Sequence, residues 1–343
     1  MSSTTATAKK SDFSIGRLLL EGRAFFALIA IIAVFSFLSP NYFTLSNFLI
    51  MSSQVAIYGI LSIGMLLVIL NGGIDLSVGS ILALSGVVAG AMMQGVTLDF
   101  AGVILYPPVW AVVVLTLAVG GAVGALNGIL IAFFKVPPFV ATLGVMYMAR
   151  GVALLMTNGL TYNNLRGQAD LGNTGFNWLG FNRLWGVPIS VIVLAVVAIL
   201  AGLMLSRSAF GRWLYASGGN ERAAELSGVP TRFVKITVYT LSGMLSAVAG
   251  LVLASQLTSA GPTAGMTYEL TAIAAVVIGG AALTGGRGNV QGTMLGAFVI
   301  GFLSAGLVII GVSSYWQTVF TGAVIVLAVL MNSIQYGKGG RKS

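Results

Sequence analysis

Long apolar runs, separated by short polar segments, are the feature that most limits what this chain can fold into. Of its 343 residues, 17 are basic and 8 acidic, while 57% are hydrophobic. Soluble domains carry roughly 25% charged residues, so the composition excludes a soluble globular protein and fits a polytopic membrane protein. Small residues let membrane helices pack closely, and the 46 glycines suit that requirement.

The apolar runs predict an all-α fold with about ten transmembrane segments. A helix needs about 20 mostly apolar residues to cross a bilayer, and fewer where other helices bury it. The first and third runs are short or interrupted by glycine, so eight or nine spans are the alternative. The predicted segments are 24–38, 54–70, 76–94, 109–134, 138–157, 187–206, 231–254, 266–283, 289–311 and 314–333. They form one transmembrane domain, 24–333, between tails at 1–23 and 334–343.

Basic residues predict the orientation, because cytoplasmic loops of membrane proteins are rich in Lys and Arg. A cytoplasmic N-terminal tail brings most other basic loops to the same side and places the C-terminal tail there too. Arg166 and Arg183, in the long loop 158–186, are the exceptions. Both termini are therefore predicted to be cytoplasmic, with the first helix kept as an uncleaved span. The basic residues assigned to the cytoplasm are Lys9, Lys10, Arg17, Arg23, Lys135, Arg207, Arg212, Arg222, Arg232, Lys235, Arg287, Lys338, Arg341 and Lys342.

The absence of Cys and His from the sequence removes several chemistries at once. Thiolate nucleophiles, imidazole bases and the usual zinc ligands are all missing. We therefore predict no catalytic residues, no metal site and no cofactor. An ion-coupled secondary transporter is a further alternative, but it is expected to bury several acidic or His relays, and the spans offer only Asp75 and Glu269.

One charged stretch lies between the sixth and seventh segments. Residues 211–235 read GRWLYASGGNERAAELSGVPTRFVK and hold six charged side chains. Gly218 and Gly219 are expected to break the preceding structure, and Asn220 to cap a helix whose positive end receives Glu221. Gly228 and Pro230 then stop it. The predicted helix is 221–226, inside a loop spanning 207–231.

This short helix has a small apolar face that another protein could approach closely. Ala223, Ala224 and Leu226 form that face, and Glu221, Arg222 and Glu225 supply a polar rim. The interpretation is a docking element. The alternative is a solvated loop whose charges only fix the orientation of the chain in the membrane.

A second polar break, NGGIDLSVGS, follows the second apolar segment. A carboxylate at bilayer depth costs roughly 3 kcal/mol, so Asp75 should face protein or water. In one reading Asp75 and Asn71 line a cavity or gate; in the other Asp75 caps the next span with Ser77 and Gly79. The segment 68–79 also resembles 276–286, where an apolar run again ends in paired glycines. Such repeated breaks point to a substrate route, unless the similarity is chance.

Four stretches together resemble the ribose-type sugar permeases of ATP-binding-cassette (ABC) importers. They are GRWLYASGGNERAAELSG at 211–228, NGGIDLSVGSILALSG at 71–86, TSAGPTAGMTYELTAIAAVVIGG at 258–280 and GVSSYWQ at 311–317. The similarity covers residues 20 to 333. It implies an all-helical permease of about ten spans in the bacterial inner membrane, with a coupling helix between spans six and seven. The residues that the resemblance assigns to ATPase coupling are Gly211, Gly219, Asn220, Glu221, Ala223, Ala224, Ser227 and Gly228.

The resemblance also implies partners and a cargo. The permease would pair with a second copy of itself, dock on a cytoplasmic ATPase and receive a monosaccharide from a periplasmic binding protein. Sugar hydroxyls need hydrogen-bonding partners. The predicted translocation path is lined by Asn71, Asp75, Asn127, Thr142, Gln256, Tyr268 and Glu269, with Asn158 as a weaker candidate.

Two further positions, Thr271 and Arg150, concern charges within the predicted spans. Members of this family often carry a second acidic residue where this chain has Thr271, two positions after Glu269, which weakens a paired-acid role. Arg150 lies inside an apolar run and is expected to pair with an acid or to extend to the outer interface. A permease for branched-chain amino acids or nucleosides is the alternative within the same class.

Overall fold

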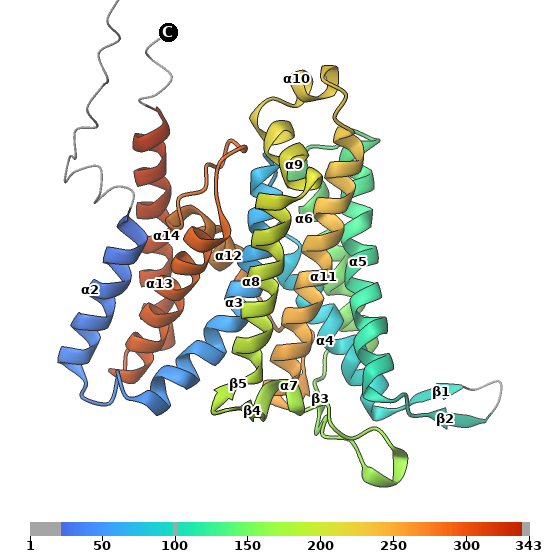
Figure 1. The fold of residues 1–343 in the computed structure, drawn as a ribbon. Coiled ribbons are helices and arrows are strands. Elements are labelled where there is room, and N and C mark those ends of the chain that lie inside the picture. The colour runs from blue at the N-terminus through green and yellow to red at the C-terminus, as the bar shows by residue number, and fades with distance from the viewer. Residues whose placement is uncertain (1–21, 99–101, 338–343) are drawn as a thin grey trace, which may run out of the picture.

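A computed structural model describes residues 22–98 and 102–337 as a bundle of helices that run roughly side by side (Figure 1). The helices α9 and α10 cover one end of the bundle, and short strands and loops cover the other. The helices are α2 (Arg23–Leu38), α3 (Leu45–Leu70), α4 (Val78–Gln94), α5 (Val109–Ala132), α6 (Pro138–Thr157), α7 (Trp178–Phe181), α8 (Ile189–Arg207), α9 (Ala209–Gly219), α10 (Glu221–Leu226), α11 (Thr231–Leu257), α12 (Tyr268–Ile278), α13 (Val290–Ile309) and α14 (Ser314–Gly337), with a 3-10 turn at Ala169–Leu171.

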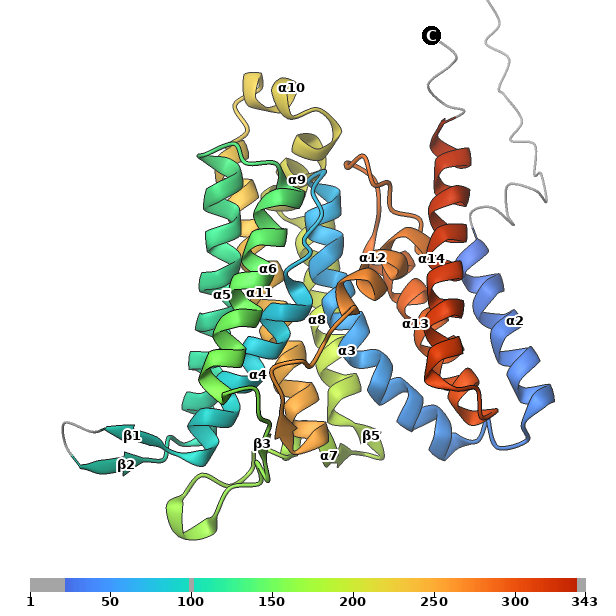
Figure 2. The ribbon, with the colours of Figure 1, turned by 180° about the vertical axis from the view of Figure 1, so that it is seen from behind.

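The strands are short and make three antiparallel pairs among the described residues. The first pair is a hairpin of β1 (Val96–Leu98) and β2 (Val103–Leu105). β3 (Tyr162–Asn163) pairs with β6 (Ser259–Ala260), and β4 (Arg183–Leu184) pairs with β5 (Val187–Pro188). The β3–β6 pair ties the long loop after α6 to the loop after α11, at the end opposite α10 (Figure 2).

An all-α architecture is confirmed, and the apolar helices match the ten predicted segments in order. Within the described residues six helices are long and apolar enough to cross a membrane: α3, α5, α6, α8, α11 and α13. Shorter apolar helices stand at the four other segments, at Ala24–Leu38, Val78–Gln94, Tyr268–Ile278 and Ser314–Leu327.

Two predicted boundaries are wrong for identifiable reasons. α3 begins at Leu45 and not near residue 54, because the Thr44 side chain caps it by accepting a hydrogen bond from Asn47 N (3.3 Å). The eighth segment is an 11-residue helix, α12, because Thr267 before it and Gly280 after it adopt positive φ. At 1.5 Å per residue, α12 is about half as long as the hydrocarbon core is thick.

The ends of the chain lie only partly within the described residues. Most of the predicted N-terminal tail, 1–21, and residues 338–343 of the C-terminal tail lie outside them. α14 continues to Gly337, beyond the predicted end of the last span at 333. The start of α2 and the end of α14 lie at the end of the bundle that carries α10 (Figures 1 and 2).

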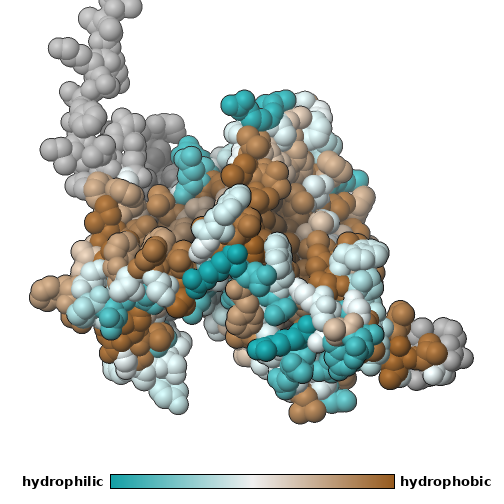
Figure 3. Space-filling model, turned by 60° about the horizontal axis from the view of Figure 1, so that its bottom comes forward, coloured by the Kyte–Doolittle hydropathy of each residue, from teal (hydrophilic) through white to brown (hydrophobic). Residues whose placement is uncertain are grey.

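The centre of the bundle is formed by α3 and α11, which are its most buried long helices. α11 packs against α5, α3 and α4, and α3 also contacts α12, α13 and α8. Hydrophobic side chains cover the flanks, while hydrophilic residues gather over the loops after α6 (Figure 3). This distribution is expected of a bundle whose sides face lipid.

A glycine stripe on α5 sets how closely α11 approaches. Gly120, Gly124 and Gly128 recur every four residues and therefore lie on one face of the helix. A Cβ atom at Gly128 would lie 2.6 Å from Ile236 Cα, and one at Gly124 would lie 3.1 Å from Gly243 Cα. The two backbones thus touch directly, which is the packing that small residues permit in membranes.

The variant Gly124→Leu is expected to lose most of its folded protein. A leucine side chain there would meet the backbone of Tyr239 and Gly243, and overpacking in a close-packed interior costs about 1–3 kcal/mol or more. Gly144→Leu is the matched control, because a Cβ at Gly144 meets nothing within 4 Å. The recovery of monodisperse protein after detergent extraction measures the effect. Equal recovery of both variants would show that the close contact is not needed.

Candidate functional site

The predicted docking helix is present as α10, over the predicted bounds Glu221–Leu226. Asn220 Oδ1 accepts a hydrogen bond from Ala223 N (3.0 Å), which caps the first turn as expected. Gly228 ends the helix with φ of +83°. A salt bridge from Lys235 Nζ to Glu221 Oε1 (2.6 Å) ties α10 to the start of α11. The helix is therefore held in a defined orientation against the bundle.

The exposed face of α10 differs from the predicted one in one residue. Ala223 and Leu226 are exposed, with Leu226 75% accessible, but Ala224 is 5% accessible and faces the bundle. The Ala224 carbonyl accepts a hydrogen bond from Val229 N (3.0 Å), because the chain turns back over this residue. Ala224 therefore packs inward and is not available to a partner.

The other residues predicted for coupling have local structural partners. The Ser227 hydroxyl donates to the Ala223 carbonyl (2.9 Å) at the end of α10. Gly211 lies where a Cβ would come within 2.6 Å of the Met204 carbonyl oxygen, so it permits the tight turn from α8 into α9. Gly219 ends α9, and a Cβ there meets nothing within 4 Å.

The helix α9 was not predicted, and it connects α10 to the two polar breaks. The Tyr215 hydroxyl donates to the Gly288 carbonyl (2.8 Å), next to the segment 276–286. The end of α9 at Gly218 packs against the Leu70 carbonyl and the Gly286 amide group, and Gly286 N donates to Leu70 O (3.0 Å). The two similar segments of the sequence thus lie side by side, with α9 against both.

A buried polar network surrounds Asp75 in the break between α3 and α4. One carboxylate oxygen, Oδ1, accepts hydrogen bonds from the backbone N (2.9 Å) and hydroxyl (2.5 Å) of Ser77. The other, Oδ2, accepts from the Ser242 hydroxyl of α11 (2.9 Å). Asn127 Nδ2, on α5, donates to the Ser77 hydroxyl oxygen (2.9 Å). All four residues are buried, so this network joins α4, α5 and α11 through one carboxylate.

Two further predicted residues lie at the same break. The Thr142 hydroxyl, on α6, donates to the Pro138 carbonyl (2.9 Å) and lies 3.2 Å from the Ile74 carbonyl oxygen. Asn71 ends α3, and its Nδ2 is buried without a hydrogen-bond partner. The prediction of Asn71, Asp75, Asn127 and Thr142 therefore selected residues that meet at one place.

Sequence reasoning missed two residues at this break, both on α11. Ser242 holds the Asp75 carboxylate, and the hydroxyl of Tyr239 lies so close to Gly73 that a Cβ there would collide with it. Tyr239, Ser242 and Ser246 are spaced by three and four residues in the middle of α11, so they lie on one face of the helix. That polar stripe was the available signal.

Glu269 and Tyr268 belong to a separate cluster, where α4 and α12 begin. A Cβ at Gly79, in the first turn of α4, would lie 2.5 Å from Glu269 Oε2. The rings of Tyr268 and Tyr58 meet edge to face, with centroids 4.9 Å apart. The first turns of α4 and α12 therefore meet at this carboxylate.

The remaining predicted residues have other surroundings. Arg150 Nη1 donates to the carbonyls of Pro262 (2.6 Å) and Ala264 (2.8 Å), and its charge also interacts with the Glu269 carboxylate, so the expected pairing with an acid is electrostatic. Gln256 Nε2 donates to the Ser53 hydroxyl (3.0 Å), away from both clusters. Asn158 ends α6 in the left-handed conformation, which Asn adopts more readily than most residues. Its presence here therefore requires no role in transport.

One protein family, described as "Branched-chain amino acid transport system / permease component", matches residues 47–329. The chain belongs to this permease family. The matched range includes α10, the Asp75 network and the α4–α12 contact. Membership of this family, together with the apolar helices, shows that this permease is an integral membrane protein with a function in transport.

Relatives of the permease are similar over nearly their whole length. The ribose import permease protein RbsC of Escherichia coli (strain K12) is 43% identical over 331 residues, which is 96% of this chain and 99% of the relative. RbsC of Bacillus subtilis (strain 168) is 44% identical, over 90% of this chain and 91% of the relative. The D-allose transport system permease protein AlsC of Escherichia coli (strain K12) is 34% identical, over 95% and 96%. No solved structure matches the permease significantly.

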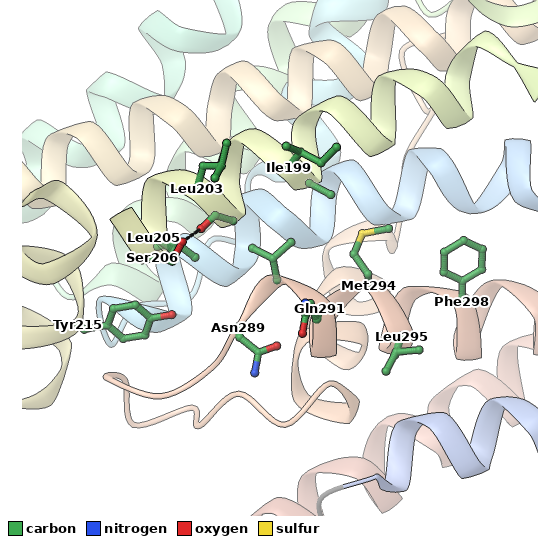
Figure 4. A pocket seen from close by; sticks show the side chains of 13 residues that line it. Ile199, Leu203, Leu205, Ser206, Tyr215, Asn289, Gln291, Met294, Leu295 and Phe298 are labelled. Carbon is green, nitrogen blue, oxygen red and sulfur yellow. Dashed lines mark hydrogen bonds between the residues drawn. The ribbon is translucent and has the colours of Figure 1, made fainter. Parts of the chain in front are cut away.

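A large groove of about 840 Å³ lies on the flank of the permease, between α8, α9 and α13 (Figure 4). Apolar side chains such as Leu203, Met294 and Phe298 line most of it, and Ser206, Asn289 and Gln291 lie toward one end. The Ser206 hydroxyl donates a hydrogen bond to the Gly202 carbonyl (2.7 Å) within α8. An apolar lining suits hydrocarbon and not a polyol, so this groove is a poor candidate for a sugar path.

Proposed function

We propose that this permease is the membrane-spanning subunit of an ABC importer that carries a ribose-like pentose or hexose across the bacterial inner membrane. The observation that carries the proposal is the 43% identity to a ribose import permease over 96% of the chain. Relatives named for allose and xylose support the same substrate class. The absence of Cys and His agrees with a subunit that makes no covalent bond.

The family description favours a second candidate substrate, a branched-chain amino acid. Reconstitution with the cognate ATPase and binding protein in proteoliposomes separates the two. ATP-dependent uptake of labelled ribose, or of another pentose or hexose, with none of leucine, is the expected result. Uptake of leucine alone would overturn the sugar assignment, and uptake by the permease without ATPase would instead indicate a secondary transporter.

We further propose that all ten apolar helices contribute to the transmembrane domain and that the α10 end faces the cytoplasm. α4 and α12 are too short to cross alone. The break before α4 holds the buried Asp75, and the break before α12 packs on α4 through Gly265, so irregular backbone is tolerated at both. The basic residues Lys135, Arg212 and Arg232 lie around α10, which supports a cytoplasmic position by the positive-inside rule.

The orientation predicts the outcome of alkaline phosphatase fusions, since this enzyme is active only in the periplasm. A fusion after Gly172, in the loop after α6, should be active, whereas one at the C-terminus should be inactive. A fusion after Gly228 serves as the internal control, because it shares the side of the C-terminus. Activity at Gly228 would place α10 outside the cell and exclude any docking on an ATPase.

In the proposed mechanism α10 docks on the ATPase subunit and α9 passes the motion on. The exposed residues Ala223 and Leu226 contact the partner, while the bridge from Glu221 to Lys235 makes α10 move with α11. α9 contacts both polar breaks, so a displacement of α10 reaches α4 and α12 together. Rigid-body shifts of this kind switch a bundle between two packings.

The proposed sugar path lies along the side of the molecule where α3 and α12 present polar groups. Tyr58 and Tyr268 provide aromatic faces with hydroxyls, and Glu269 is partly exposed beside them. A partly exposed carboxylate within a span is expensive against lipid. It is therefore expected to face water or a second copy of the chain, which agrees with a path between two permease subunits.

A further inference from the structure

A cleft of about 610 Å³ lies beneath α10, at the end of the bundle that carries the basic residues. Four segments enclose it: α10, the first turns of α11, the turn between α5 and α6, and the break after α3. Its volume is within the range of small-molecule sites, about 300–1,000 Å³. Of the residues predicted for the translocation path, Asn71 alone lines this cleft, and the exposed Ala223 and Leu226 of α10 do not.

The charges in the cleft do not balance. Its two acids are already paired, Glu221 with Lys235 (2.6 Å) and Glu225 with Arg222 (3.0 Å). Lys135 and Arg232 also line the cleft, and neither has a carboxylate partner within the part of the chain that the structure describes. The cleft therefore carries a net charge of two positive units from its side chains. Arg232 stacks over the Phe133 ring (5.7 Å to the centroid), which restricts the directions its guanidinium can take.

The floor of the cleft adds two unsatisfied polar groups. Asn71 Nδ2 and the Tyr239 hydroxyl are buried atoms without a hydrogen-bond partner, and both residues line the cleft. Tyr239 as a whole is 1% accessible. An unpaired buried donor destabilises the structure, so a ligand that offers acceptors here removes that destabilisation.

All four unpartnered groups can donate hydrogen bonds, and they come from different directions. Lys135 approaches from the α5–α6 turn, Arg232 and Tyr239 from α11, and Asn71 from the end of α3. The N-terminus of α11 opens onto the same space without a side-chain cap, which adds a partial positive charge. A tetrahedral anion with several acceptor oxygens matches this arrangement better than a planar carboxylate.

We propose that this cleft binds a phosphate group. The phosphate belongs either to a soluble phosphate monoester or to the headgroup of an anionic phospholipid, since the exposed rings of Phe133 and Phe134 stand beside the cleft. A bound phosphate ties α11 and the α5–α6 turn to Asn71 at the end of α3. Because the bridge from Glu221 to Lys235 joins α10 to α11, the phosphate also holds the proposed coupling helix in one position relative to the Asp75 break.

The test uses the purified full-length chain and its melting temperature. Inorganic phosphate and glycerol 3-phosphate are titrated against chloride at equal ionic strength, and nanodiscs with phosphatidylglycerol are compared with nanodiscs of phosphatidylcholine alone. The wild-type chain is expected to gain thermal stability from the phosphate probe. Lys135→Gln combined with Arg232→Gln should weaken that binding by about tenfold or more, which is about 1.4 kcal/mol.

Two variants keep the test interpretable. Arg207→Gln removes an exposed cation at the same end but outside the cleft, and it should bind like the wild type. Tyr239→Phe removes only a hydroxyl that has no internal partner, so its fold should be intact while its affinity for phosphate falls severalfold.

The outcomes separate the sources of the phosphate. A response to both soluble probes supports a soluble phosphate monoester, and a response only to phosphatidylglycerol supports a lipid headgroup. No response to any probe, or an equal response in the double variant, overturns the proposal. Loss of binding when the ATPase subunit is added would mean that the ATPase fills the cleft, and this result too would overturn a small-ligand site.

Discussion

A permease carrying Leu226→Asp in α10 is expected to lose its ATPase subunit while still inserting and folding. Leu226 is 75% accessible, so no contact inside the chain is broken. If Leu226 is a central anchor of the docking interface, its replacement costs about 2 kcal/mol or more, and each 1.4 kcal/mol is about tenfold in affinity. Co-purification of the ATPase should fall about thirtyfold, and ATP-dependent uptake should fall with it.

Three further variants test whether the loss of ATPase binding is specific to the exposed face of α10. Ala223→Arg, on the same exposed face, should act like Leu226→Asp. Leu160→Asp changes an equally exposed leucine (71% accessible) at the opposite end of the bundle and should leave ATPase binding unchanged. Ala224→Leu is expected to destabilise the fold instead, because Ala224 packs inward. ATPase binding that survives both outward-facing changes would contradict the docking role of α10.

The salt bridges of α10 are expected to contribute much less than its apolar face. Arg222 and Glu225 are 77% and 52% exposed at their side chains, and exposed pairs contribute about 0–1 kcal/mol. The bridge from Lys235 to Glu221 is partly buried and orients the helix. The interface is therefore better tested at Leu226 than at any of the charged residues around it.

Local signals explain which parts of the fold were predictable. α10 was predicted within its observed bounds because Asn220 and Gly228 are strong signals for the start and the end of a helix. The ten apolar runs were likewise visible, since a span must be apolar for most of its length. Both features depend on neighbouring residues only.

The parts that were missed depend on contacts between distant segments. The helix α9 was not predicted, although Gly218 and Gly219 end it as expected. The missing side chain at Gly218 also lets this helix approach Leu70 and Gly286. Ala224 was predicted to lie on the outward face of α10, but the turn at Val229 packs over it. Likewise, no local pattern shows that Ser242 is the residue that reaches Asp75, 167 positions away.

The candidate site depends both on local sequence signals and on contacts between distant segments. Asn71, Asp75, Asn127 and Thr142 were selected for being polar inside apolar runs. Three of them find hydrogen-bond partners at the break, as buried polar groups usually do, whereas Asn71 Nδ2 has none. Arg150 followed the same rule with a different partner, two backbone carbonyls. The rule predicts that partners exist, but only the packing of α6 beside the loop after α11 decides which ones they are.

The variants Asp75→Asn and Asp75→Ala are expected to differ sharply in transport. Asparagine keeps the Oδ1 acceptor for Ser77 and can donate from Nδ2 to the Ser242 oxygen, so the break between α3 and α4 keeps its geometry. Alanine leaves the donors of Ser77 and Ser242 unpaired in a buried site, at about 1–3 kcal/mol each. Uptake by Asp75→Asn should stay within about threefold of wild type, while Asp75→Ala should lose about 30-fold or more.

The control for these variants lies on the same helix as Ser77. The Ser85 hydroxyl, in α4, is buried but has no hydrogen-bond partner, so Ser85→Ala should transport normally. If Asp75→Asn abolishes uptake while the complex with the ATPase still assembles, the negative charge itself is needed, and the carboxylate belongs to the sugar path or its gate. If Asp75→Asn transports normally, the carboxylate acts as the cap that joins α4 to α11, because Ser242 and Ser77 need only an acceptor and a partner of the right shape at this position.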